Sequence, residues 1–354
     1  MNHPGDAAHS APKHEKVESF SAAELRKKTQ HTTPPQPESY YDAEDDPHYT
    51  GIIRLGSAAS QYNFNTSAPI SREKPLERTF SGGQASVASE RHIHNEDATF
   101  VDIVSRSAGV FDGVGADSSS NLASEAARSI FRERLASIPA TLSPRNIRDY
   151  LREIAQKASD EVTAKAGSAS TTGVAAIFRE DEQGNEYIAW ISAGDSRLYL
   201  FDTAGDREHT LTPLTLDHAW YLELAYPNNP IAQMNYQRTV AEMESRKGLN
   251  DHIIINSLGR KYDADRVTTG ALMLSGGEKF MLFSDGVTDN LRDSEIAKLL
   301  QQATEEDIDN QQTADRIVER ARQVSIGEKS DAFGTDGISG RAKVDDISAA
   351  VITG

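Results

Sequence analysis

Residues 108–115 read AGVFDGVG: a short apolar run leads into Asp112, and glycines follow. Such a pattern brings a carboxylate to the end of a buried strand and then turns the chain sharply. It returns at residues 280–286, FMLFSDG, and a third acidic site, Asp345 with Asp346, leads into an apolar run. Three carboxylate positions at strand ends predict one metal centre, around which the rest of the chain can be interpreted.

The composition indicates a soluble globular protein with additional polar sequence. The chain has 354 residues, of which 37% are hydrophobic and 26% charged, and its formal net charge is -17. This charge argues against a nucleic-acid partner, which needs a basic face. The lack of cysteine excludes disulfides, thiolate zinc sites and a cysteine nucleophile. No apolar run approaches the ~20 residues of a membrane helix and the N-terminus has no signal pattern, so we expect a cytoplasmic protein without a membrane partner.

Residues 1–80 have the composition of a disordered or weakly ordered tail. Eight of the 13 prolines lie there, and apolar periodicity is sparse. Such a segment cannot bury enough apolar surface to offset the loss of chain entropy on folding. We therefore expect one folded domain at residues 81–354, with a flap-like surface insertion at about 213–262. The role of the tail, regulatory or docking a partner, stays open, as does the oligomeric state.

The order of elements predicts an α+β fold. Strands are expected at residues 98–104, 108–111, 173–178, 187–191, 197–201, 278–284 and 347–353. Helices are expected to begin near Asn121, Ser143, Asp293 and Asp307, the first with Leu122 and Ala126 on its apolar face. Because strands and helices do not alternate singly, the pattern favours antiparallel sheets buried between pairs of helices.

Acidic residues at the predicted strand ends suggest what the domain does. Carboxylates that are brought together repel, so the fold must hold protons or cations among them. Ligand sets made of oxygen suit Mg²⁺, Mn²⁺ or Ca²⁺. The candidates are spread over about 250 positions rather than one short calcium loop, which is typical of an active site. Two ions ~3.5–4 Å apart can activate a water for displacement at phosphorus.

Eight short motifs occur in an order that resembles a known family. They are residues 95–97, 110–115, 171–173, 194–197, 216–218, 257–259, 283–289 and 345–348. Together they resemble the metal-dependent serine/threonine protein phosphatases of type 2C, over residues 82–354. The resemblance implies a four-layer α-β-β-α sandwich of two antiparallel sheets flanked by helix pairs. It also implies two Mg²⁺ or Mn²⁺ ions at one edge of the sheets.

The resemblance assigns the ligands of the two ions. Asp112 would bridge them, and Asp285 and Asp345 would complete the shell of one ion. Glu96 and the backbone carbonyl of Gly113 would bind the other.

Three further aspartates receive supporting roles from the same resemblance. Asp97 would orient a water at the metal centre. Asp195 and Asp289 match positions that hold a third, weaker ion in some members. On their residues alone, Asp195 is equally consistent with a turn in a tight hairpin, and Asp289 with a helix cap.

One departure from the family concerns the substrate phosphate. The family usually has an arginine four residues before its metal-binding glutamate, where this chain has His92. Arg91 lies one position further away, and on a strand an offset of one reverses the direction of the side chain. A protonated His92, or Arg106 from the adjacent hairpin, could bind the phosphate instead. The predicted catalytic residues are therefore Asp97, His92 and Arg91.

The predicted function is Mg²⁺/Mn²⁺-dependent hydrolysis of phosphoserine and phosphothreonine in proteins. The partner is then a phosphorylated protein, and an acidic surface favours basic or neutral sequence around the phosphate. Two alternatives remain: a catalytically inactive binding or scaffold module, and a phosphomonoesterase that acts on small molecules.

Overall fold

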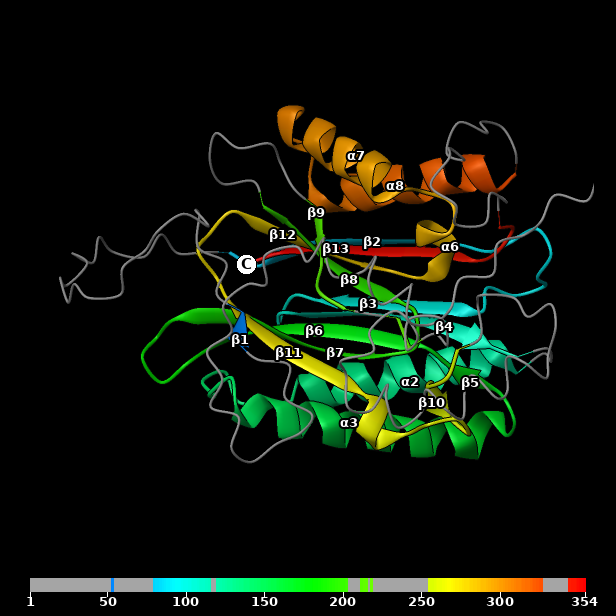
Figure 1. Ribbon diagram of the computed structural model, residues 1–354, viewed down its shortest axis with the longest axis horizontal. Helices are drawn as coiled ribbons and strands as arrows, with labels where there is room; N and C mark the ends of the chain where they lie inside the picture. Colours follow the sequence, from blue (N-terminus) through cyan, green and yellow to red (C-terminus); the bar gives the residue numbers. More distant parts are fainter. Residues whose placement is uncertain are drawn as a thin grey trace, which may run out of the picture. The chain divides into compact units, whose positions relative to one another are not determined.

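The computed structural model describes residues 52–53, 79–115, 119–202, 211–215, 217–218, 254–326 and 343–354 (Figure 1). All of them belong to one compact unit, Tyr41–Gly354. Most of the predicted tail at 1–80 lies outside the described residues, as does most of the predicted flap at 213–262. None of the helices within the described ranges is both long and apolar enough to cross a membrane.

The first sheet has eight strands in the order β1-β11-β7-β6-β4-β5-β10, with β3 paired to β4. Its strands are β1 (Ile52–Ile53), β3 (Asp97–Asp102), β4 (Ser107–Val114), β5 (Ser170–Thr171), β6 (Gly173–Glu180), β7 (Glu186–Ala193), β10 (Leu258–Gly259) and β11 (Thr268–Met273). β1 falls within the range expected to be a tail and pairs in parallel with β11. The other described pairings are antiparallel.

The second sheet has five strands in the order β2-β13-β12-β8-β9. They are β2 (Ser81–Val87), β8 (Arg197–Asp202), β9 (Leu211–Pro213), β12 (Glu278–Phe283) and β13 (Ile347–Thr353). Each pairs antiparallel with its neighbours.

Helix pairs cover the outer face of each sheet, so the unit has four layers (Figure 1). α2 (Ser120–Leu135) and α3 (Asn146–Ala166) share a core with the first sheet. α7 (Asp293–Glu305) and α8 (Asn310–Ser325) share one with the second sheet. The described residues also form two short helices, α6 (Asp285–Thr288) and the 3₁₀ helix η2 (Ala264–Arg266). The predicted α+β sandwich is confirmed.

A third core fills the space between the sheets and explains the continuous apolar strands. Val110 packs in this inner core, whereas Phe111, the next residue, packs among the helices α2 and α3. Successive residues of a strand point to opposite faces, so a strand with two buried faces has no polar alternation. Burial of each large side chain contributes ~1.5–3 kcal/mol.

Local signals placed several elements correctly. The strands expected at 98–104 and 108–111 form a hairpin, but its turn spans residues 103–106, because β3 and β4 pair as far as Asp102 opposite Ser107. α3 begins at Asn146, three residues after the expected start at Ser143, whose Oγ accepts the N–H of Asn146 at 3.2 Å. The expected apolar face of α2 was wrong at one position, because half of Leu122 is exposed. Asp293 was expected to cap α7 but is its first residue.

The connection between β7 and β8 is not the tight hairpin that was one of two interpretations of Asp195. β7 belongs to the first sheet and β8 to the second, so residues 194–196 carry the chain from one sheet to the other. Gly194 begins this crossover with a φ of 106°, a conformation that favours glycine. The crossover places Asp195 between the two sheets.

Candidate metal centre

The β3–β4 hairpin supplies the first two carboxylates of the site. Its register places Asp97 directly opposite Asp112. The backbone of Asp112 is held on its other side by Thr171 and Thr172. Thr172 Oγ1 accepts the N–H of Asp112 at 3.1 Å, and the carbonyl of Asp112 accepts from Thr172 N and Thr171 Oγ1, each at 2.8 Å.

Gly113 follows Asp112 at a point where the backbone is crowded. A Cβ atom at this position would lie 2.5 Å from the carbonyl oxygen of Ser120 and 2.8 Å from that of Glu96. The N–H of Gly113 also donates to the carbonyl of Glu96 at 3.1 Å. Only glycine lets these backbone segments approach so closely.

The second sheet supplies further carboxylates from the ends of two adjacent strands. β12 runs into Asp285, the first residue of α6, and Asp345 lies two residues before β13. The sheets are joined at this point, because Ser284 Oγ donates to Asp97 Oδ2 at 2.8 Å. The same Ser284 Oγ accepts the N–H of Ser348 at 3.0 Å.

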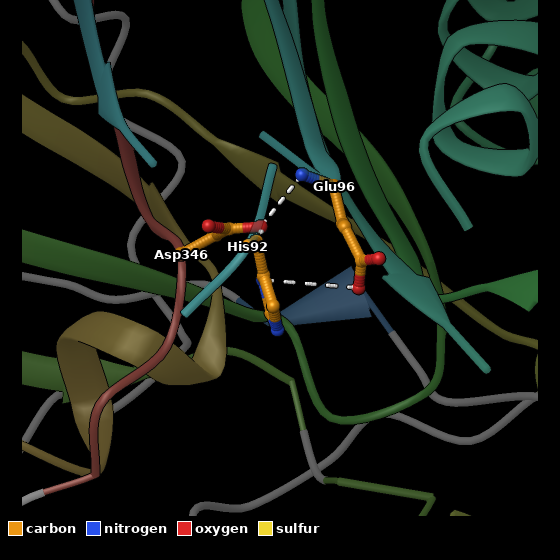
Figure 2. Close-up of side chains that lie close together, drawn as sticks. All are labelled: His92, Glu96 and Asp346. Carbon is orange, nitrogen blue, oxygen red and sulfur yellow. Dashed lines mark hydrogen bonds and ion pairs between the residues drawn. The ribbon is translucent and has the colours of Figure 1, made fainter. Parts of the chain in front are cut away.

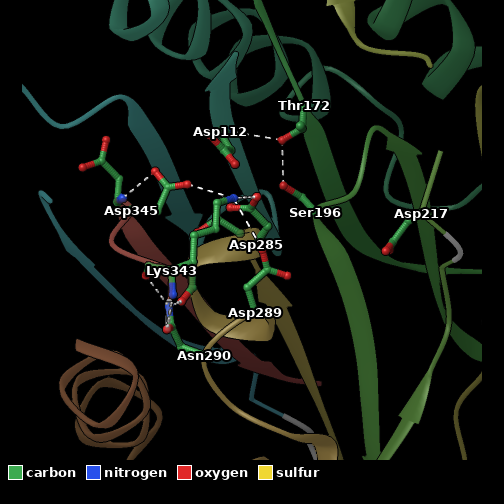
Figure 3. Close-up of polar contacts among 12 residues, drawn as sticks. Asp112, Thr172, Ser196, Asp217, Asp285, Asp289, Asn290, Lys343 and Asp345 are labelled. Atoms are coloured by element: carbon green, nitrogen blue, oxygen red, sulfur yellow. Dashed lines mark hydrogen bonds and ion pairs between the residues drawn. The ribbon is translucent and has the colours of Figure 1, made fainter. Parts of the chain in front are cut away.

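Asp195, from the crossover, completes a group of three carboxylates that could bind one ion. Asp112, Asp195 and Asp285 each offer an oxygen atom within 4.8 Å of the others. Figure 3 shows Asp112 and Asp285 facing the same space from opposite sheets, beside Thr172 and Ser196. The hydroxyls of Thr172 and Ser196 lie 2.7 Å apart and link this edge of the first sheet to the crossover.

Burial and mutual repulsion shift the pKa values of these carboxyl groups upward. Burial raises the pKa of Asp97 to about 8, although hydrogen bonds from Ser348 and Ser284 lower it. Burial, and next the charge of Asp285, raise the pKa of Asp112 and of Asp195 well above the usual range. The same two causes raise the pKa of Asp345. The folded chain therefore gathers negative charge that a cation would stabilise.

The donor chemistry of the cluster fits a hard divalent cation. Asp97 Oδ1 and Asp195 Oδ1 are buried and, within the described part of the chain, have no hydrogen-bond partner. Buried carboxylate oxygens rarely stay unsatisfied, and oxygen-only sets are those that Mg²⁺ and Mn²⁺ prefer.

A cation of the chain itself, Lys343, lies among the same carboxylates. Its Nζ contacts Asp285, lies 2.9 Å from Asp345 Oδ2 and lies 3.5 Å from Asp289 Oδ2 (Figure 3). Burial alone would lower the pKa of Lys343, but Asp285, Asp345 and Asp289 together raise it. The ammonium group is therefore held in its charged form.

A second acidic group surrounds His92 beside this centre. His92, Glu96 and Asp346 each offer a ligand atom within 4.8 Å of the others (Figure 2). His92 Nδ1 lies 3.0 Å from Asp346 Oδ2 and 3.9 Å from Glu96 Oε2. Burial lowers the pKa of His92, but the hydrogen bond to Asp346 and the nearby carboxylates raise it overall.

The segment that carries these residues is a loop, contrary to the strand on which the offset between Arg91 and His92 was interpreted. β2 ends at Val87 and β3 begins at Asp97. His92 turns inward to Asp346, whereas Arg91 is exposed. Arg106 does not serve the site, because it lies at the other end of β4 from Asp112 and pairs with Glu186 at 2.7 Å.

The structure thus brings most of the predicted residues to one edge of the two sheets. Asp285 acts electrostatically on four other predicted residues, Asp97, Asp112, Asp195 and Asp345. Glu96 belongs to the neighbouring group with His92 and Asp346.

Two residues at the site, Lys343 and Asp346, had no predicted role. Asp346 was noticed only as the second of two acids before a strand. The available signal for Lys343 was its position, two residues before Asp345. The threonines at 171 and 172 stood in a quoted motif, but their hydrogen bonds to Asp112 were not foreseen.

Comparison with known proteins gives a consistent result. A model of the family described as protein phosphatase 2C matches residues 87–319. The serine/threonine phosphatase stp of Listeria monocytogenes is 25% identical over 197 residues, which are 54% of this chain and 70% of that protein.

Solved structures have the same fold. The S. agalactiae serine/threonine phosphatase is 18% identical with a TM-score of 0.55, over 77% of this chain and 98% of that one. The catalytic domain of the phosphatase PstP, solved with 2 manganese ions, is 19% identical with a TM-score of 0.51, over 77% of this chain and 97% of that one.

Proposed function

We propose that this chain, which belongs to the protein phosphatase 2C family, hydrolyses phosphoserine and phosphothreonine in proteins and requires Mg²⁺ or Mn²⁺. The family assignment confirms the resemblance and the enzyme class predicted from the motifs, protein serine/threonine phosphatase. The choice of metal, the number of ions, the residue roles and a cytoplasmic location are our proposals.

One observation carries the proposal: carboxylates from both sheets converge on a small buried region. Asp112, Asp285 and Asp345 would hold the ions there, with Glu96 and the carbonyl of Gly113 from the neighbouring loop and strand. When bound, divalent ions lower the pKa of water and stabilise charge on phosphoryl oxygens. Asp195 and Asp289 would serve a third ion or orient groups around the first two.

Asp97 is suited to hold a proton at the centre. Its Oδ2 accepts from Ser284 Oγ, while its Oδ1 has no partner within the described residues. Burial raises the pKa of Asp97 to about 8 in the metal-free chain; bound cations would lower it, and the carboxylate could then accept a proton from a water at the centre.

His92 is suited to contact the substrate phosphate. Its Nδ1 faces Asp346, and this hydrogen bond favours the protonated ring. The remaining ring nitrogen could donate to a phosphoryl oxygen or to the leaving alkoxide. We assign Arg91, which is exposed on the same loop, to the approach of the substrate rather than to the reacting atoms.

The test is phosphate release from p-nitrophenyl phosphate and from phosphoserine and phosphothreonine peptides, with Mn²⁺ and with EDTA. Asp285→Asn should lower the metal-dependent rate by about 100-fold or more, because an amide is a poor replacement for a carboxylate ligand. Asp160→Asn, an exposed site on α3, is the matched control and should leave the rate unchanged. Unchanged activity of Asp285→Asn would refute the site.

The same assay addresses the alternatives. No metal-dependent turnover by the folded protein would favour a binding module. Faster turnover of phosphorylated metabolites than of phosphopeptides would favour a small-molecule phosphatase. We also propose that residues 81–354 form the catalytic domain, so a chain lacking residues 1–80 should retain activity, although it loses β1.

A further inference from the structure

Lys343 is fixed at the site by its backbone. Asn290, which is 1% exposed, accepts the N–H of Lys343 with Oδ1 at 3.0 Å and donates from Nδ2 to its carbonyl at 2.9 Å. The same Nδ2 donates to the carbonyl of Gly286 in α6 at 2.8 Å. Asn290 thereby ties Lys343 to the short helix that begins with Asp285.

The side chain then reaches into the carboxylate cluster. Nζ contacts Asp285 and Asp345, two of the proposed metal ligands, and approaches Asp289, proposed for a third ion. In Figure 3 the lysine side chain extends between Asp345 and Asp285. Its positive charge therefore offsets part of the repulsion among these carboxylates.

We propose that Lys343 is an internal cation that competes with the divalent metal for Asp285 and Asp345. The inference rests on the proposed function, because it takes these two aspartates as metal ligands. A Mg²⁺ ion binds its oxygen ligands at ~2.0–2.1 Å, so an ion bound through Asp285 Oδ2 or Asp345 Oδ2 would displace the ammonium group that contacts these oxygens. The two positive charges would also repel each other strongly at that separation.

Because Asn290 anchors the backbone of Lys343, a divalent ion can replace the ammonium group without unfolding of the protein. Lysine carries its charge on a flexible four-carbon side chain, so Nζ can leave the cluster while the backbone of Lys343 stays bonded to Asn290. Lys343 therefore stabilises the metal-free protein by partly neutralising the carboxylates. It weakens metal binding by the same free energy, because only those molecules in which Nζ has left the cluster can bind the metal.

Mn²⁺ binding, measured by isothermal titration calorimetry without substrate, tests the competition. Lys343→Met and Lys343→Gln should each bind Mn²⁺ at least ~10-fold more tightly than the unaltered protein. Both should melt at a lower temperature in EDTA, and added Mn²⁺ should raise their melting temperature more than that of the unaltered protein. Lys298→Met, which removes the same charge from an exposed position on α7, should change neither quantity.

Unchanged or weaker Mn²⁺ binding by both variants would overturn the competition, and so would equal melting temperatures in EDTA. If Lys343→Met does not fold in EDTA, recovery of its circular dichroism on adding Mn²⁺ supports the proposal, and failure to recover contradicts it. Asp285→Asn distinguishes a failure of the competition from a failure of the proposed metal site. If it abolishes Mn²⁺ binding while the lysine variants behave normally, only the competition fails; if it binds Mn²⁺ normally, the metal site and the competition fail together.

Discussion

Asp346 accepts a hydrogen bond from the backbone N–H of Glu96 at 2.6 Å, across 250 positions of sequence. Its other oxygen accepts the N–H of Ser89 at 2.5 Å. One buried carboxylate thus holds both ends of the loop that carries His92. Asp346 positions the loop, whereas its neighbour Asp345 faces Lys343 and the metal centre.

Asp346→Ala should therefore release the loop. The buried N–H of Ser89 and the partly buried N–H of Glu96 lose their acceptor, which should destabilise the protein by about 2–3 kcal/mol. Phosphatase activity should fall by about 10-fold or more, because Glu96 and His92 lose their orientation. Asp346→Asn keeps one acceptor oxygen, so its stability and activity should lie between those of Asp346→Ala and those of the unaltered protein. Activity of Asp346→Ala equal to the unaltered protein would contradict the positioning role; kinetics and urea unfolding measure both effects.

Gly113→Ala tests the crowding at the end of β4. The new methyl group would meet the backbone carbonyls of Ser120 and Glu96, neither of which can rotate away. We expect a loss of stability of about 1–3 kcal/mol and a large loss of activity. At Gly115 a Cβ would lie 3.1 Å from the hydroxyl of Ser120, a side chain, so Gly115→Ala should be milder. Equal thermal stability of the two variants would argue against the close approach.

His218 should make the protein sensitive to acid. Its Nδ1 accepts the N–H of Gly194 at 3.1 Å, and burial lowers its pKa from 6.5 to about 4. Between pH 6.5 and about pH 4, His218 is protonated in the unfolded chain but neutral in the folded protein. The contribution of His218 to the free energy of unfolding is therefore complete above pH 6.5 and decreases as the pH falls to about 4. At ~1.4 kcal/mol for each unit of pKa, the loss approaches about 3 kcal/mol.

His218→Asn retains an acceptor for Gly194 but does not titrate in this range. In EDTA, so that both proteins are metal-free, the stability difference between the unaltered protein and the variant should shrink as the pH falls from 7 to 4.5. Urea unfolding at several pH values measures it. A difference that is independent of pH would mean that His218 does not remain neutral in the folded protein.

Arg197→Met should be strongly destabilising. Arg197 makes two hydrogen bonds of 2.7 Å to the carboxylate of Asp217, whose side chain is 5% exposed. Removal of the guanidinium group takes away the bidentate counter-charge that Arg197 supplies to this buried carboxylate, and breaking such a buried pair costs about 3–5 kcal/mol. Arg128→Met, which breaks the exposed pair with Glu125, should cost at most about 1 kcal/mol. Similar unfolding midpoints for the two variants would contradict this difference.

Local patterns predicted those parts of the site that depend on one hairpin or one strand end. The tight turn after Asp102 sets the register that places Asp97 opposite Asp112. The apolar runs before Asp285 and after Asp345 located two more carboxylates at the ends of β12 and β13. The family resemblance then supplied the topology that brings these ends together.

Long-range contacts determine the features of the site that local sequence patterns did not predict. The path of residues 88–96 depends on Asp346, so tertiary hydrogen bonds replace the expected strand with a loop. Lys343 reaches the carboxylates because Asn290, 53 positions earlier, fixes its backbone. The segment after β7 was equally consistent with a tight hairpin, because short connections usually join neighbouring strands, and its local sequence does not reveal that β8 lies in the other sheet.

That crossover, together with the bond from Ser284 to Asp97, means that the carboxylates belong to both halves of the sandwich. An ion held by Asp112 and Asp285 would join β4 of one sheet to the end of β12 in the other. The chain has no cysteine, so it has no disulfide with which to tie its layers together. The metal centre would serve as a reversible cross-link of the sandwich, and loss of the ion would loosen the protein as well as stop its chemistry.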